Sequence, residues 1–94
     1  MEEKEIKLRL ASAWLDRALG KDSHSGFESC VAEAQNYLRQ VGEQELADKL
    51  SYANLHFQKP VVDVRNILKE KYGIREYGDM PNIERLEGEL RYGE

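Results

Sequence analysis

The chain has 94 residues, of which 40% are hydrophobic and 34% are charged. This length suits one domain with one modest core, and no apolar run approaches the roughly 18 residues of a membrane-spanning helix. A single cysteine excludes an internal disulfide. The first residues also lack the uninterrupted apolar stretch of a secretory signal, so we expect a cytoplasmic protein without a membrane segment.

The net charge of −4 is concentrated at the C-terminal end. Residues 1–75 hold twelve acidic and twelve basic residues, whereas residues 76–94 hold six acidic residues and two arginines. We therefore divide the chain into a helical bundle domain, 1–75, and an acidic segment, 76–94. Because nucleic-acid-binding domains carry a basic excess, this balance argues against nucleic acid as a partner.

The first predicted helix covers residues 2–19, and its apolar residues extend around more than half of its circumference. At about 100° per residue, an ordinary surface helix has a narrower apolar stripe. A helix of this kind either lies centrally in a bundle or turns one side to another chain. The sequence therefore allows a homodimer through this helix.

The segment 16–30, DRALGKDSHSGFESC, contains the first histidine and the only cysteine. Ser25 and Glu28 stand three residues apart, as in a capping box, and predict a helix over residues 26–41. Cys30 falls on the apolar face of that helix, where a thiol packs as a small hydrophobic group. We interpret the segment as the corner between two helices rather than as a Cys–His reaction centre.

A third helix is predicted over residues 43–57, although Tyr52 and Leu55 fall outside its apolar face. A fourth is predicted over residues 60–72, because proline suits the first turn of a helix. The two predicted helices are alternatively one helix kinked at Pro60.

The fourth helix carries a short basic strip. Arg65 and Lys69 stand four residues apart and therefore lie on one face. This strip is either a solvated face or a surface that contacts RNA or the acidic segment.

A short fifth helix is predicted over residues 82–91, with an apolar stripe formed by Ile83, Leu86 and Leu90. So short a helix is marginal in water, and Gly88 weakens it further. We expect it to be ordered only when it is docked on its own bundle or on a partner. The candidate interaction surface comprises Arg65, Lys69, Ile83, Leu86 and Leu90.

The residue pattern predicts no catalytic, cofactor-binding or metal-ligating residue. Cys30, His24 and His56 match none of the ligand spacings of zinc or calcium sites. The chain has no glycine-rich phosphate loop and no convergent acid, base and nucleophile. We therefore expect a protein that is not an enzyme and needs no cofactor.

The stretch GFESCVAEAQNYLRQVG, within the hairpin 8–42, resembles the second-helix region of HEPN domains, which are small helical bundles. Members that cut RNA carry an arginine, often followed by a polar residue, and then a histidine after four to six further residues. Arg65 matches the start of that motif, but residues 70–72 hold no histidine. Arg17 and His24 have the spacing without the polar residue. The resemblance covers about a third of the chain and implies a member that does not cleave RNA.

The predicted fold is all-α, a small bundle of four helices with a short C-terminal fifth helix. The predicted function is a non-catalytic interaction or regulatory module that binds a protein, either a second copy or another chain. One alternative is an HEPN-like RNA-processing or toxin–antitoxin component that does not cleave. A second is a helix-turn-helix nucleic-acid binder that uses the helix 60–72.

Overall fold

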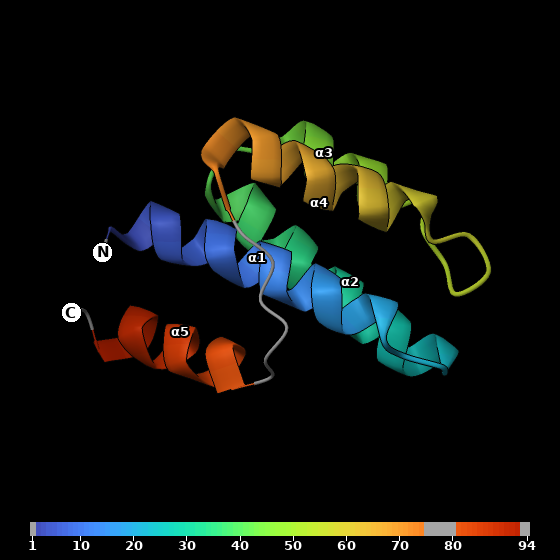
Figure 1. Ribbon diagram of the computed structural model, residues 1–94, viewed down its shortest axis with the longest axis horizontal. Coiled ribbons are helices and arrows are strands. Elements are labelled where there is room, and N and C mark those ends of the chain that lie inside the picture. The colour runs from blue at the N-terminus through green and yellow to red at the C-terminus, as the bar shows by residue number, and fades with distance from the viewer. Residues whose placement is uncertain (1, 75–80, 93–94) are drawn as a thin grey trace.

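The computed structural model describes residues 2–74 and 81–92. In this part of the chain it contains five helices and no strand (Figure 1). The all-α prediction is therefore confirmed. The helices are α1 (Glu3–Leu19), α2 (His24–Gln40), α3 (Gln44–Leu50), α4 (Lys59–Tyr72) and α5 (Pro81–Tyr92).

Helix α1 lies centrally, with α3 and α4 on one side and α5 on the other (Figure 1). Its most extensive contact is with α2, and it also packs against α4 and α5. One face of α1 contributes to the main core through Leu8, Ala11, Leu15 and Ala18. A second α1 face, formed by Ile6, Leu10 and Ala13, contacts α5. The wide apolar arc is thus covered within the chain, and the homodimer through this helix stays a prediction.

The main core lies between α1, α2, α3 and α4. Its largest side chains, among them Phe27, Leu38, Leu50 and Leu68, are fully buried. A buried side chain of this size contributes roughly 1.5–3 kcal/mol to stability. Ile74, just after α4, is also buried in this cluster. The four-helix part therefore has a continuous core without any residue of α5.

The corner between α1 and α2 differs from the prediction. Helix α2 begins at His24, and Ser23 rather than Ser25 is its N-cap. The Oγ atom of Ser23 accepts a hydrogen bond of 3.2 Å from the backbone N–H of Gly26. Gly26 permits this close approach, because a Cβ atom there would lie 2.9 Å from that oxygen. The predicted capping box at Ser25 and Glu28 was therefore wrong by two residues.

Helix α3 is much shorter than the predicted helix over 43–57, because it ends at Leu50. Residues 51–58 form a loop, so the alternative of one kinked helix was wrong. Within this loop the side-chain oxygen of Asn54 accepts a hydrogen bond of 2.8 Å from the N–H of His56. Asparagine commonly offers the backbone such a turn in place of a helix.

The remaining helix boundaries agree with the sequence to within two residues. Helix α4 carries Pro60 in its first turn and ends before Gly73, whose φ of 67° is left-handed. Helix α5 was predicted over residues 82–91 and is observed in that place. The boundary drawn between residues 75 and 76 lies outside the described residues and stays a prediction.

No helix in the described ranges has both the length and the apolar character needed to cross a membrane.

Candidate interaction surface

Arg65 and Lys69 do not form a free basic strip. The Nη1 atom of Arg65 lies 2.9 Å from the Oδ1 atom of Asp16 on α1, and both side chains are largely buried. Lys69 is exposed on the same helix. Arg65 therefore joins α4 to α1, and only Lys69 of this pair faces solvent.

The apolar residues of the acidic segment contact α1. Ile83 and Leu86 are buried against the second α1 face, and the partly buried Leu90 packs on the same cluster. Helix α5 therefore does not dock on the basic strip of α4, the surface that charge had suggested for the acidic segment. The reason is that the second α1 face offers apolar area, which supplies more affinity than surface charge.

The titratable residues of the corner have separate neighbours. Cys30 is buried in the main core, and this burial raises the pKa of its thiol despite the nearby positive charges of Lys21 and Arg17. His24 and His56 are exposed and pack edge to face, with 5.1 Å between their ring centroids. Among residues 2–74 and 81–92, no three side chains of metal-ligating type come together.

Arg17 and His24, which have the spacing of the HEPN motif, also have different neighbours. The guanidinium carbon of Arg17 lies 4.8 Å from the centre of the Trp14 ring, whereas His24 contacts His56 on the α3–α4 loop. A carrier of the cleaving motif would need the two side chains to act on one substrate.

The loop 51–58 is held in one conformation by several hydrogen bonds. The backbone N–H of Phe57 donates to the carbonyl of Asn54 over 2.9 Å, and the N–H of Asn54 donates to the carbonyl of Phe57 over 3.1 Å. The side chain of Gln58 donates to the carbonyl of Leu55 over 3.0 Å. Leu55 itself packs against the main core. The loop is therefore anchored at its centre and at its end.

The start of the loop is anchored to α2. The side-chain amide of Gln35 donates to the carbonyl of Ala47 over 2.8 Å and to the hydroxyl of Ser51 over 3.1 Å. A shallow cavity of about 310 Å³ lies beside these bonds, and its lining mixes apolar and polar groups. The lining residues are Glu28, Val31, Gln35, Leu50, Ser51 and Ala53.

Two large apolar side chains on this loop face solvent. Tyr52 is 75% exposed and Phe57 is 49% exposed, and among the described residues the one other exposed large hydrophobic side chain is Tyr92, at 77%. The name aromatic loop surface is used here for the exposed Tyr52 and Phe57 of this loop and for the edge-to-face pair of His56 and His24. Exposed aromatic residues on a rigid scaffold are typical of binding sites.

Sequence reasoning missed this surface because it placed Tyr52 and Phe57 inside a helix. A signal was present, since Tyr52 and Leu55 did not fit the apolar face of the predicted helix. Asn54, between them, is a frequent turn residue. These three residues together would have favoured a loop.

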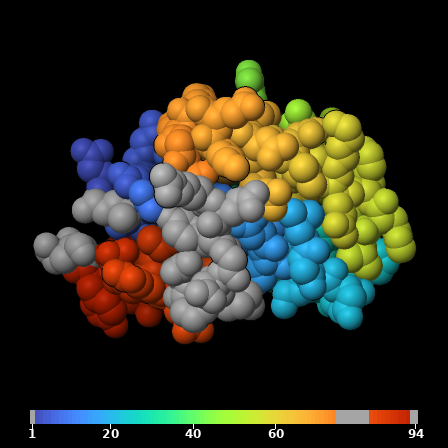
Figure 2. Space-filling view, viewed as in Figure 1, coloured from blue at the N-terminus to red at the C-terminus, as the bar shows by residue number. Residues whose placement is uncertain are grey.

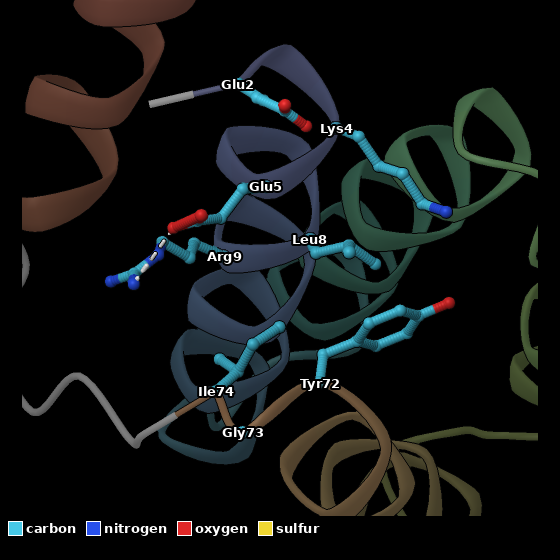
Figure 3. Close-up of a pocket in the computed structure, with 8 residues that line it drawn as sticks. All are labelled: Glu2, Lys4, Glu5, Leu8, Arg9, Tyr72, Gly73 and Ile74. Carbon is cyan, nitrogen blue, oxygen red and sulfur yellow. Dashed lines mark ion pairs between the residues drawn. The ribbon is translucent and has the colours of Figure 1, made fainter.

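A second cavity, of about 360 Å³, lies between the start of α1 and the end of α4 (Figure 3). In Figure 3 the side chains of Glu5 and Arg9 point to one side, whereas Lys4 and the hydroxyl of Tyr72 point to the other. Glu5 and Arg9 form an ion pair of 3.2 Å. The polar groups therefore do not converge on one point of the cavity. The lining residues are Glu2, Lys4, Glu5, Leu8, Arg9, Tyr72, Gly73 and Ile74.

Glu43 joins the start of α3 to the end of α4. Its carboxylate accepts a hydrogen bond of 2.8 Å from Nζ of Lys71 and another from the hydroxyl of Tyr72. These hydrogen bonds lower the pKa of Glu43, and the bond to Glu43 raises the pKa of Tyr72. Since the carboxylate is occupied by two donors of its own chain, we assign it a structural role.

Compared with family models, with curated proteins and with solved structures, the chain matches none. The HEPN resemblance therefore stays a prediction, and the function has to be argued from the surfaces described above.

Proposed function

We propose that this chain is a non-catalytic interaction module that binds a protein partner through the aromatic loop surface. The observation that carries the proposal is the exposure of Tyr52 and Phe57 on a hydrogen-bonded loop. Aromatic side chains supply large contact areas at low entropic cost, and tyrosine adds a hydrogen bond.

The fixed conformation of the loop supports a binding role. The turn at Asn54 and the hydrogen bond from Gln35 to Ser51 hold the loop before any partner arrives. A preordered loop costs less to bind than one that has to be ordered during association. The partner would offer an apolar patch for the two aromatic rings and acceptors for the hydroxyl of Tyr52.

Affinity purification with the tagged full chain tests this proposal. Replacing Tyr52 and Phe57 together by serine is expected to lower recovery of the partner at least tenfold, which is the loss expected for interface hot spots. Tyr92→Ser is the control, because Tyr92 is about as exposed as Tyr52 but lies on α5. It should leave recovery unchanged.

Thermal unfolding of both variants shows whether any loss of binding comes from misfolding. The side chains concerned are exposed, so both variants should keep the wild-type melting temperature to within a few degrees. Recovery of the same partner by the folded double variant at the wild-type level would refute the proposal.

The HEPN-like alternative and nucleic-acid binding through α4 stay predictions. Both involve Arg65, which in this structure is paired with Asp16. An RNA-cleavage assay tests the first. Nucleic-acid binding measured over a salt series tests the second, because phosphate contacts make affinity fall steeply with salt.

A further inference from the structure

The two histidines of the chain form one pair at the surface. His24 is the first residue of α2, and His56 lies in the loop 51–58. Their ring centroids are 5.1 Å apart, the ring planes meet at 67°, and both residues are exposed. Figure 2 shows the start of α2 (cyan) next to this loop (yellow-green) at one end of the molecule. The fold therefore brings together two imidazoles from separate elements.

The backbone at both histidines is held by groups other than the imidazole rings. Ser23 caps α2 directly before His24. The backbone N–H of His56 donates to the side-chain oxygen of Asn54 over 2.8 Å, and Asn54 exchanges two backbone hydrogen bonds with Phe57. A ligand shared by the two rings would therefore have to order only their side chains, which lowers the entropic cost of binding it.

The separation of the rings suits a shared metal ion. An imidazole nitrogen binds Zn²⁺ at about 2.0–2.1 Å, so two imidazoles on one ion have ring centres about 4.5–5.2 Å apart, the larger value at the tetrahedral angle. The observed 5.1 Å lies near that larger value. In an edge-to-face pair at least one ring has to rotate before a nitrogen of each faces the same point, and the exposure of both residues permits this rotation.

We propose that His24 and His56 form a two-histidine site for a divalent transition-metal ion, and that Zn²⁺ is the ion whose geometry fits the pair best. Imidazole nitrogen suits zinc, copper and nickel, whereas magnesium and calcium require oxygen ligands. Within residues 2–74 and 81–92 no third side chain of ligating type joins the pair, so water completes the coordination. The bound ion would link the start of α2 to the loop 51–58.

Spacing along the chain predicted no metal ligand at these positions, because zinc motifs are recognised by ligands close together in the sequence. The site does not rest on the proposed protein partner. Metal binding is measured on the chain alone, so the failure of either proposal leaves the other to be decided by its own experiment.

Isothermal titration of the full chain, purified without a histidine tag, with ZnCl₂ is the first test. A site with half the protein ligands of a structural zinc site should bind one ion with a Kd of about 1–100 µM. His24→Phe and His56→Phe keep an aromatic ring but remove the nitrogen ligands, and each should weaken binding at least tenfold. Cys30→Ala is the control, because this thiol is buried in the main core, and it should bind zinc as the wild type does.

Thermal unfolding with and without zinc shows whether the ion joins parts of the folded chain. At free zinc about tenfold above the Kd, the melting temperature of the wild type should rise by roughly 5–10 °C. The two histidine variants should keep the wild-type melting temperature without zinc, since both residues are exposed, and should show no rise when zinc is added.

Proton–nitrogen NMR spectra of the imidazole rings identify the ligands in the wild type, and so do not depend on any variant folding. One ring nitrogen of His24 and one of His56 should shift together as zinc is added, with a single midpoint. The proposal is overturned if only one of the two rings responds, if the chain binds no zinc at 1 mM, or if a folded histidine variant binds zinc with wild-type affinity.

Discussion

Ser23 places the start of α2 through a single hydrogen bond to the N–H of Gly26. Loss of such a cap costs about 0.5–2 kcal/mol, so Ser23→Ala should lower the free energy of unfolding by this amount. Ser25 lies within the first turn of α2, and Ser25→Ala should cost much less. Denaturant unfolding of the two variants checks the order, and equal losses would place the cap elsewhere.

Glu43 should make the stability of the chain depend on pH. Its pKa in the folded state is lowered from 4.5, mainly by the hydrogen bond from Lys71 and then by that from Tyr72. The stabilisation is therefore fully present above 4.5 and is lost as the pH falls through the folded-state pKa. The pKa of Tyr72 is raised from 10.0, mainly by its hydrogen bond to Glu43. The stabilisation from Tyr72 is therefore fully present below 10.0 and is lost as the pH rises through the folded-state pKa of Tyr72.

Glu43→Gln should therefore remove part of the loss of stability in acid and in strong alkali. The measurement is the free energy of unfolding as a function of pH. Glu45→Gln is the control, because Glu45 is exposed at the start of the same helix, whereas the hydrogen bonds from Lys71 and Tyr72 go to Glu43. If the free energy of unfolding falls equally in acid for both variants, Glu43 is not the cause of that fall.

At the scale of helices, the ion pair between Asp16 and Arg65 fixes α4 against α1. Its side chains are 15% and 23% exposed, and hydrogen bonds between charged groups in such surroundings contribute about 1–3 kcal/mol. Asp16→Asn should cost an amount in this range. The pair of Lys59 and Asp63 lies within α4 at the surface, so Asp63→Asn should cost at most about 0.5 kcal/mol. Chemical denaturation compares the two, and the reverse order would contradict the assignment.

Replacement by alanine should change the stability in opposite directions at Gly88, inside α5, and at Gly73, directly after α4. Gly88 has open space around its missing side chain, and Gly88→Ala should stabilise the protein by up to about 1 kcal/mol. Gly73 has a left-handed φ of 67° after α4, and Gly73→Ala should cost about 1–2 kcal/mol. Thermal unfolding measures both effects. An unchanged stability on Gly88→Ala would mean that α5 is not docked as a helix in solution.

At the scale of the whole molecule, α5 determines whether the second α1 face is exposed. Uncovering this face through Leu86→Asp would leave Ile6 and Leu10 exposed to water, and exposed apolar patches promote association. Sedimentation velocity at several concentrations should show one species for the wild type and larger species for Leu86→Asp as concentration rises. A dimer of the wild type would instead support contact between two copies through another surface or through α1.

Only part of the candidate interaction surface could be predicted from the sequence. The stripe of Ile83, Leu86 and Leu90 followed from helical spacing, and the structure places all three on one side of α5. The charged part of the predicted surface differs in the structure, because Arg65 donates a hydrogen bond to Asp16, which lies 49 residues earlier in the chain. The aromatic loop surface was missed because apolar spacing extended the predicted third helix beyond Leu50.

The sequence by itself determined the fold class, the presence of five helices and most of their ends. Those properties are local, since they depend on the 3.6-residue period of apolar positions and on residues such as Pro60 and Gly73. Only the tertiary structure decided which helix covers each face of α1 and which residues pair across helices. Tyr37 and Glu87 are 50 residues apart, and a contact at such a separation follows from the packing of whole helices rather than from any local pattern.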